Sequence, residues 1–449
     1  MKISIFWHRR DLRLHDNAGL YHALRGDHPV LPLFIFDKVI LDDLIDENDA
    51  RVTFIHDEIE RLREELRHLG SAIIVRYGEP LEVWKALLEE YDIGAVYTNR
   101  DYEPYALQRD QLVADLLAAQ NIAFMTAKDH VIFEGNEVLK KDGDPYVVYT
   151  PYSRRWRAKL DTEIRTVTNE EGETEDISYY LQSYPNEKYF ENFYPTDVLP
   201  APTLSEMGFE RSDVPFPDTM VSRELIKNYS QRRNFPASEG TSRLGVHFRF
   251  GTISIRERAR RARRLNDTFL NELIWRDFYS QILQHFPRVV TESFREKYDR
   301  IPWRNNPTEF ELWCQGKTGY PIVDAGMRQL VQSGYMHNRV RMIVASFLTK
   351  HLLIDWRWGE SFFARFLLDY ELASNNGGWQ WAAGGGTDAS PYFRVFNPEA
   401  QQQKFDKQKA YIREWVPEYG TSDYPEPIVE HKFARERAIQ TYKTALSGG

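Results

Sequence analysis

The sequence is nearly free of cysteine. Cys314 is the single cysteine among 449 residues, so the chain can form neither an intramolecular disulfide nor a cysteine-based metal cluster, and we expect no metal site. No stretch approaches the roughly 20 apolar residues that span a bilayer. The first ten residues carry charges and no long apolar run follows them, which is untypical of a signal peptide. We therefore expect a soluble, cytoplasmic protein with no membrane partner.

Internal repeats, heptads and low-complexity tracts are also missing, which excludes solenoids and long coiled coils. The formal net charge of −9 argues against a protein that coats nucleic acid indiscriminately, although it leaves room for a local basic patch. Aromatic residues, in contrast, are abundant at 14% of the chain. They favour broad planar contact surfaces as well as large cores.

The first 130 residues alternate short apolar runs with amphipathic stretches. The runs expected to form buried strands are 3–7, 30–36, 72–76, 95–98 and 122–126, and the expected helices are 54–69, 81–91 and 105–119. This rhythm predicts a doubly wound α/β domain with a parallel sheet over residues 1–130. Ligands of such sheets bind beyond the carboxyl ends of the strands. The run after the first strand, 8–13, lacks the GxGxxG motif, however, and its arginines also fit a solvated rim.

The character of the chain changes after residue 130. Between 131 and 215 the periodicity fades, and the segment is first acidic and polar and then rich in proline, which predicts a connector running over the surface of the first domain. From 216 to 449 helical patterns dominate and predict an all-α domain. Two domains agree with the length of the chain.

A glycine-rich segment, 369–398, combines paired amides, two tryptophans and an aromatic–basic run in the sequence DYELASNNGGWQWAAGGGTDASPYFRVFNP. Glycines are kept where a chain must turn or approach another group closely. We interpret the segment as a long loop. Two roles remain open for it, a functional loop and a loop whose tryptophans fill a core.

Residues 240–244, GTSRL, place a glycine and two hydroxyls where a helix is expected to begin. The free N–H groups at such a start can bind phosphate, with Arg243 adding charge. Simple capping of a surface helix by the hydroxyls explains the same pattern. The residues alone leave both alternatives open.

A helix expected over 269–283 has two different faces. Glu272, Trp275, Arg276 and Tyr279 fall at i, i+3, i+4 and i+7 and therefore share one face. That face offers a carboxylate, a stacking plane and a cation to one ligand. It also fits an exposed stripe with a weak Glu–Arg pair.

Residues 340–354 are too apolar for anything but a buried helix, which begins with HNRVRM. Asn338, Arg341 and Met342 fall on one side of it. Because a buried guanidinium without a partner is costly, we expect Asp369 to pair with Arg341. The remaining polar groups point to a ligand, and a purely structural ion pair is the alternative.

Together these segments resemble the photolyase/cryptochrome family over almost the whole length. The matching motifs, in order and with the family's spacing, are FWHRRDLRLHDN, GTSRL, ELIWRDFY, KTGYPIVDAGMRQL, MHNRVRM, LLIDWRWGE and NNGGWQWAAGGGTDASPYFRVFNP. Within the family the sequence most resembles class I cyclobutane pyrimidine dimer photolyases. The resemblance implies FAD in the helical domain and pyrimidine-dimer DNA as the partner. It implies light-driven repair, in which excited reduced FAD passes an electron to a flipped-out dimer.

The resemblance also assigns residues. The positions that match FAD-binding residues are Tyr229, Thr241, Ser242, Arg243, Leu244, Asn271, Asn338, Arg341, Asp369, Glu371 and Asn375. Those that match the lesion pocket are Glu272, Trp275, Asn338, Met342 and Trp381, and those that match phosphate-contacting positions are Arg233, Arg276, Arg339 and Arg394. Trp379, Trp356 and Trp303, in that order outward from the flavin, match the family's photoreduction chain.

The sequence departs from the family pattern at several positions. One common hydroxyl of the phosphate turn is missing after Leu244, and Phe269 stands where relatives often carry tryptophan. Tyr105 and Ala106 replace the Asn–Glu pair of folate-using enzymes. Folate is therefore disfavoured as a second chromophore, and a deazaflavin, a flavin or no antenna remains.

A cryptochrome-type blue-light receptor that binds FAD without repair is the alternative function. Asn375 disfavours it, because plant-type cryptochromes carry Asp at the matching position, and so do the intact lesion-pocket motifs. The (6-4) photolyases carry a histidine pair that HNRVRM lacks.

We expect a monomer without an obligate protein partner.

Overall fold

The computed structural model describes residues 1–168 and 174–447. Residues 169–173 of the expected connector, and 448–449, lie outside the described residues. The chain forms two compact units, within which the backbone segments lie close together in space. Each unit is discontinuous in sequence. The first contains Met1–Val138, Arg154–Thr219 and Leu244–Arg264, and the second contains Leu139–Ser153, Met220–Arg243 and Leu265–Gly449. The domain boundaries expected at 130 and 215 stay predictions.

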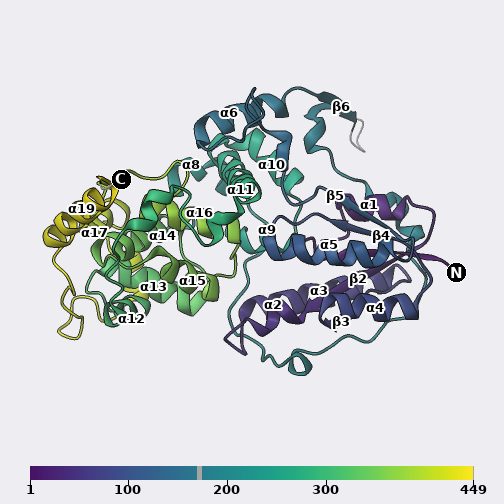
Figure 1. The fold of residues 1–449 in the computed structure, drawn as a ribbon, viewed down its shortest axis with the longest axis horizontal. Helices are drawn as coiled ribbons and strands as arrows, with labels where there is room; N and C mark the ends of the chain where they lie inside the picture. Colours follow the sequence, from purple (N-terminus) through teal and green to yellow (C-terminus); the bar gives the residue numbers. More distant parts are fainter. Residues whose placement is uncertain (169–173, 448–449) are drawn as a thin grey trace. The chain divides into compact units, whose positions relative to one another are not determined.

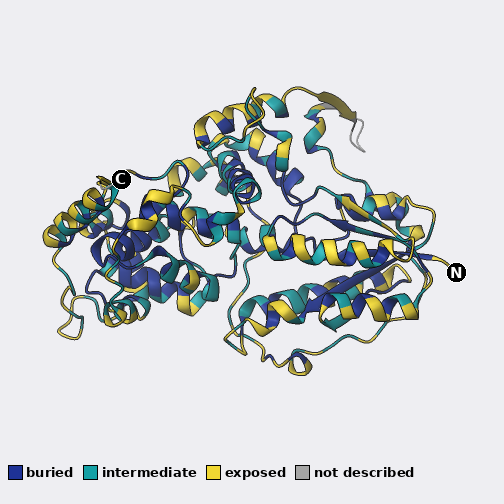
Figure 2. Ribbon diagram, viewed as in Figure 1, coloured by how far each residue is buried: buried dark blue, intermediate teal, exposed yellow. Residues whose placement is uncertain are grey.

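The first unit holds a five-stranded parallel sheet in the order β3-β2-β1-β4-β5 (Figure 1). The strands are β1 (Ile3–His8), β2 (Val30–Asp37), β3 (Ile74–Gly78), β4 (Ile93–Asn99) and β5 (Ala123–Ala127). β1 and β2 are buried along their whole length (Figure 2), as expected of central parallel strands covered on both faces. The predicted doubly wound domain is confirmed.

Helices connect the strands of this sheet. They are α1 (Ala18–Leu24), α2 (Lys38–Asp42), α3 (Ala50–His68), α4 (Pro80–Glu90) and α5 (Pro104–Ala118), and α9 (Gly245–Phe250) and α10 (Ile255–Leu265) join the unit later in the chain. The prolines that start α4 and α5 suit the first helical position, where no N–H partner is needed. The sequence pattern had predicted α3, α4 and α5 and had left α1 and α2 unassigned.

The segment expected to be an aperiodic connector contains regular structure. It includes α6 (Tyr149–Leu160) and an antiparallel hairpin of β6 (Ile164–Thr168) and β7 (Thr174–Ser178). Tyr152 and Trp156 on α6 are almost completely buried. The sequence pattern had revealed neither this helix nor the hairpin, because the burial of α6 depends on aromatic residues without a clear period. The assignment of 131–215 as a connector stays a prediction.

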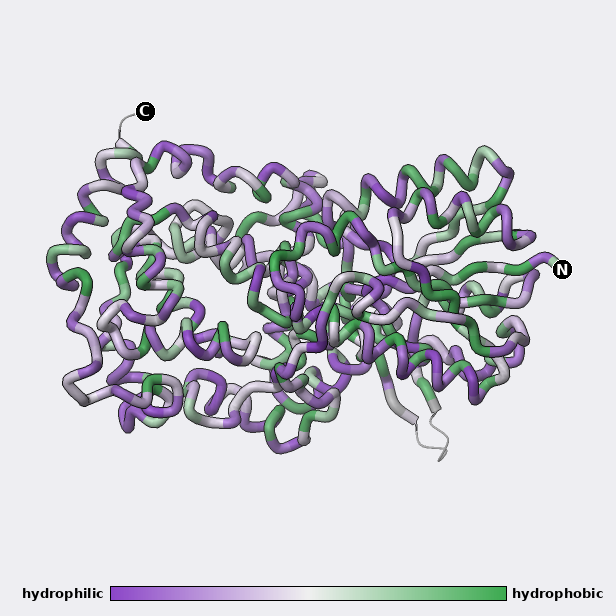
Figure 3. Tube along the Cα trace, turned by 90° about the horizontal axis from the view of Figure 1, so that it is seen from below, coloured by the Kyte–Doolittle hydropathy of each residue, from purple (hydrophilic) through white to green (hydrophobic). Residues whose placement is uncertain are grey.

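The described part of the second unit is helical, as predicted. Its helices are α7 (Arg223–Lys227), α8 (Tyr229–Arg232), α11 (Asp267–His285), α12 (Pro307–Cys314), α13 (Pro321–Ser333), α14 (Asn338–Ser346), α15 (Trp356–Phe366), α16 (Leu372–Ala383), α17 (Pro398–Phe405), α18 (Ala410–Trp415) and α19 (His431–Ser447). In Figure 3 hydrophobic and hydrophilic stretches alternate along the helices, as one buried face requires. Within residues 1–168 and 174–447, no helix is long and apolar enough to cross a membrane.

Two local expectations in this unit are corrected. The buried helix expected over 340–354 is α14 followed by a π-helical turn at Phe347–His351. The glycine-rich segment is largely not a loop, because α16 contains both amides, the first glycine pair and both tryptophans. α16 ends at Gly384, whose φ of 94° lies in the left-handed region that favours glycine.

Candidate active site

One side of α11 carries the polar and aromatic residues singled out from the sequence. Asn266 caps the helix by accepting hydrogen bonds from the N–H groups of Thr268 and Phe269. Leu273, Phe278 and Ile282 are buried, whereas Glu272 and Trp275 are only partly buried. The predicted division of this helix into two faces is confirmed.

Glu272 forms an ion pair with Arg233, which follows α8. Burial raises the pKa of Glu272, and the neighbouring Arg233 opposes that shift. The guanidinium of Arg233 also lies over the ring of Tyr229, 5.3 Å from its centroid. Three predicted residues with three different expected roles are thus neighbours at the start of α11.

Arg341 pairs with Asp369, as expected from the cost of a buried guanidinium. Its Nη2 donates to both carboxylate oxygens, at 3.0 and 3.1 Å, and its Nε donates to the carbonyl of Met336 at 2.7 Å. Asn338 is exposed at the first turn of α14, and Met342 lies beside the guanidinium of Arg339. The pair therefore anchors α14 to the start of the glycine-rich segment.

Tyr335 is a site residue that the sequence pattern did not reveal. Its hydroxyl lies 3.0 Å from that of Thr241, and the Arg243 guanidinium is 4.9 Å from its ring centroid. Helix α9 begins only after Leu244 and has no side-chain cap. The hydroxyl of Thr241 thus bonds Tyr335, and both interpretations of the 240–244 turn stay predictions. Leu244 is buried and belongs to the first unit.

α16 packs against α11 (Figure 1), and Asn375 on α16 is partly buried. The amide of Asn375 donates to the Glu360 carboxylate at 2.8 Å and to the Glu360 carbonyl at 3.1 Å. Glu371, just before the helix, binds Arg276 through two hydrogen bonds of 2.9 and 3.1 Å. Because Arg276 is largely buried in that pair, its expected DNA contact stays a prediction.

The glycine pair of α16 shows which of its sides is filled. A Cβ placed on Gly377 would lie 2.2 Å from the ring of Tyr279, so this side is closed by α11. A Cβ on Gly378 would meet no atom within 4 Å. An open surface therefore lies next to Asn375, one turn along the helix.

The three tryptophans expected to form an electron path share one hydrophobic core. Trp379 and Trp356 are each 2% exposed, whereas Trp303 is only partly buried. Gly359 on α15 makes room for Trp379, because a Cβ there would lie 2.1 Å from the indole. Trp381 packs against the same core and remains partly exposed.

Three of the four arginines expected to bind DNA lie close enough to influence one another. Burial lowers the pKa of Arg339, and the positive charges of Arg233 and Arg394 lower it further. Arg339 donates to the side chain of Asn234 at 2.7 Å, and Arg394 is exposed. A local basic patch thus exists on an acidic chain.

In the first unit, the carboxyl ends of β1 and β4 are occupied by ion pairs of the chain itself. Arg10 binds Asp101 and Glu103 at 3.0 and 3.1 Å, and Glu103 also pairs with Arg249. The cavity at this point measures only about 10 Å³. Tyr105, one of the two residues that replace the Asn–Glu pair of folate-using enzymes, donates a hydrogen bond from its hydroxyl to the carboxylate of Asp37 at 2.8 Å.

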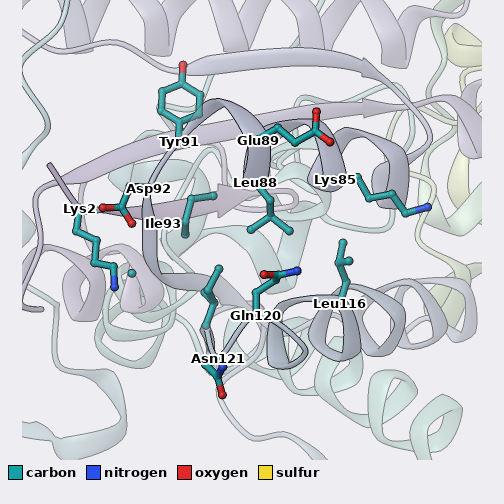
Figure 4. A pocket seen from close by; sticks show the side chains of 12 residues that line it. Lys2, Lys85, Leu88, Glu89, Tyr91, Asp92, Ile93, Leu116, Gln120 and Asn121 are labelled. Carbon is teal, nitrogen blue, oxygen red and sulfur yellow. The ribbon is translucent and has the colours of Figure 1, made fainter.

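A larger depression of about 690 Å³ lies at the opposite, amino ends of the strands (Figure 4). Lys2 and Asp92, which precede β1 and β4, line it together with Leu88 of α4 and Leu116 of α5. No residue expected in the site lies there. Among the described residues, no group of three or more histidine, cysteine, aspartate or glutamate side chains could hold a metal ion.

Comparison with protein families places both parts of the chain. Residues 4–169 match the model described as DNA photolyase, and residues 269–422 match the FAD binding domain of DNA photolyase. The chain belongs to the DNA photolyase family.

Individual relatives match nearly the full length. A deoxyribodipyrimidine photo-lyase from Halobacterium salinarum is 40% identical over 99% of both chains. The structure of a bacterial class III photolyase from Agrobacterium tumefaciens has a TM-score of 0.82 at 32% identity, covering 100% of this chain and 98% of that one. An archaeal photolyase from Sulfolobus tokodaii, solved with two FAD molecules, has a TM-score of 0.80 at 33% identity, covering 98% and 99%.

The residues present fit FAD, the cofactor of this domain. Hydroxyls and a guanidinium around Tyr335 suit a pyrophosphate, and the open surface at Gly378 leaves room for a flat ring beside Asn375. His337, which caps α14 through Nδ1, is 2% exposed, and its Nε2 has no hydrogen-bond partner among the described residues. A buried N–H group without a hydrogen-bond partner, such as this one, is expected where a bound ligand accepts the missing hydrogen bond.

Proposed function

We propose that this protein is a light-driven lyase that repairs cyclobutane pyrimidine dimers in DNA. Family membership supports the general activity. The observation that carries the substrate assignment is the side of α11 on which Glu272 and the partly exposed Trp275 lie one turn apart, with Arg233 paired to Glu272. A stacking plane next to a carboxylate suits a flipped-out pyrimidine pair.

Bound FAD supplies the light absorption and the transferable electron. The residues that would hold its phosphates are Tyr229, Thr241, Ser242, Arg243 and Leu244. Those that would hold its ring and ribose are Asn338, Arg341, Asp369, Glu371 and Asn375, and Asn271 would add a further contact. Glu360 accepts the amide hydrogens of Asn375 and thereby leaves the amide oxygen as an acceptor for the cofactor.

At the lesion, Trp275 and Trp381 receive the extruded dimer by stacking and apolar contact, together with Asn338 and Met342. Flipping the dimer out of the duplex costs less free energy than flipping a normal base, because the dimer has lost aromaticity and stacks poorly. Glu272 hydrogen-bonds the carbonyl and imide edge and stabilises the negative charge that develops on the dimer. Desolvation of Glu272 favours its protonated, donating form.

Two further groups complete the account. Trp379, Trp356 and Trp303 would form an electron path between solvent and the bound cofactor, which agrees with the burial of the first two and the partial exposure of the third. Arg233, Arg339 and Arg394 bind phosphates, and Arg276 contributes if DNA draws it away from Glu371. Their contribution to affinity is expected to weaken with salt.

The substrate class is tested with two lesions. Purified protein containing FAD, chemically reduced, is illuminated with oligonucleotides that carry either a cyclobutane thymine dimer or a (6-4) photoproduct. We expect restoration of the cyclobutane dimer alone. Repair of the (6-4) lesion instead contradicts the substrate assignment, and bound FAD without repair of either lesion favours the receptor function. The absorbance spectrum of the same sample reports any second chromophore.

A further inference from the structure

The ring of Trp275 is held by an aromatic residue from outside α11. Tyr149, the first residue of α6, stacks on it with ring centroids 3.6 Å apart and planes within 3° of parallel. Phe278 meets Trp275 edge-on at 5.7 Å, and Tyr279 lies tilted at 5.5 Å. Trp275 nevertheless remains partly exposed. Since Tyr149 covers one face of the indole, the accessible remainder is left for another planar group.

Tyr149 is itself fixed from three directions. Its hydroxyl donates to the side-chain oxygen of Asn271 at 2.6 Å and lies 3.0 Å from the Asn271 carbonyl, one turn before Trp275. Its backbone N–H lies 3.4 Å from the carboxylate of Asp388, in the loop after α16. The side of its ring meets Phe278 at 5.7 Å. With only 7% of its surface exposed, Tyr149 cannot change rotamer without breaking these contacts.

We propose that Tyr149 is a positioning residue for the lesion pocket, which fixes the plane of Trp275 and the orientation of the Asn271 amide. The inference rests on the proposed function, since it gives Trp275 the stacking role. Because Tyr149 already holds one face of the Trp275 ring, the indole loses little rotational freedom when a dimer stacks on its other face. This preorganisation increases the affinity for the dimer. The hydroxyl, by donating to the Asn271 oxygen, also leaves the amide nitrogen free to donate elsewhere.

This role differs from ordinary core packing. Tyr152, one turn further along α6, is more deeply buried than Tyr149 and packs against Phe278 at 5.2 Å. Its ring also lies edge-on to Tyr146 at 6.4 Å, whereas the ring stacked on Trp275 is that of Tyr149. Tyr152 is therefore a matched control, because its replacement disturbs the same helix and the same core without touching the stacked pair.

The test compares Tyr149→Leu, Tyr149→Phe and Tyr152→Leu in the FAD-containing full-length protein. Binding of a thymine-dimer oligonucleotide and of the undamaged oligonucleotide is measured in the dark at one salt concentration. We expect Tyr149→Leu to lose about tenfold of the preference for the dimer, because the unsupported indole must be ordered when the dimer stacks on it, with unchanged affinity for undamaged DNA. Tyr149→Phe keeps the ring and retains the preference. Tyr152→Leu lowers thermal stability and leaves the preference intact.

Each outcome separates this inference from the proposed function. A parent protein that shows no preference for the dimer contradicts the proposed function itself. With a parent that does discriminate, an unchanged preference in Tyr149→Leu overturns the inference. So does tighter dimer binding, which would place Tyr149 where the lesion belongs. Should Tyr149→Leu fail to fold, Tyr149→Met, an unbranched side chain that fills irregular gaps, takes its place with the same criteria.

Discussion

Arg233 and Glu272 are joined by an ion pair, which links a cation proposed to bind DNA to the carboxylate proposed to bind the lesion. Burial raises the pKa of Glu272, while the charge of Arg233 lowers it. If Arg233 moves to a phosphate when DNA binds, the carboxylate loses the partner that holds it ionised. The protonated form, which can donate a hydrogen bond, is then favoured.

Removal of the carboxylate should lower repair without affecting the cofactor. Glu272→Ala is expected to reduce the quantum yield of dimer repair severalfold at saturating DNA, because one electrostatic contact to the developing charge is lost. FAD content, read from absorbance, should be unchanged. Glu272→Gln retains a hydrogen-bond donor and should lose less. An unaltered yield in Glu272→Ala removes this residue from the mechanism.

Loss of an exposed cation at the basic patch should change the salt dependence of DNA binding. For Arg394→Ala, the slope of log K against log salt concentration is expected to become shallower by about 0.9, the value for one phosphate contact on duplex DNA. Affinity should fall equally for damaged and undamaged DNA. Arg413→Ala is the control, because this exposed arginine on α18 is not among the charges that act on Arg339. If both variants give the parent slope, Arg394 does not contact a phosphate.

The tryptophan path is tested by photoreduction. Trp379→Phe preserves an aromatic filler beside Gly359 but removes the more easily oxidised indole. Illuminated oxidised protein should then fail to become reduced, whereas repair by chemically reduced protein should persist. Trp358→Phe, on the same helix as Trp356 and packed against Phe310, should behave like the parent. Photoreduction of Trp379→Phe at the parent rate shows that electrons take another route.

A pH effect on stability follows from His337. Burial, reinforced by nearby arginines, lowers the pKa of His337 to about 4. Between about pH 6.5 and pH 4, His337 is therefore protonated in the unfolded chain and neutral in the folded chain. Stability is therefore lost as pH falls from about 6.5 towards 4, by about 2 kcal/mol between pH 7.5 and 5.

The variant His337→Asn isolates this effect, because asparagine can also cap α14 and does not titrate. Urea unfolding at pH 7.5 and pH 5 should show a loss for the parent that exceeds the loss for His337→Asn by that amount. Equal losses would mean that His337 is not held neutral by the fold.

The sequence was most informative where a physical cost forces a pattern. The five strands were located from continuous apolar runs, which strands buried on both faces need. The expected burial holds throughout β1 and β2 and is wrong for β5, an edge strand that is largely exposed. The pairing of Arg341 with Asp369 followed from the cost of burying a lone guanidinium. These arguments need only the composition of a short segment, and the structure confirms both the strands and the ion pair.

Other features depended on partners far away in the chain. Gly377 and Gly378 argue against a helix by propensity, yet both lie in α16, where the ring of Tyr279 from α11 packs against Gly377. Tyr149 lies in a segment without periodicity, and the residue that its hydroxyl binds is 122 positions away. No local pattern reports such contacts. The tryptophan chain and the DNA contacts were assigned by resemblance alone and stay predictions.

The most direct measurement of the central claim is restoration of a thymine-dimer oligonucleotide by the chemically reduced, FAD-containing protein, compared under blue light and in darkness. The account predicts intact thymines in the illuminated sample and none above background in the dark. Absence of light-dependent restoration, with FAD bound and fully reduced, would contradict the account.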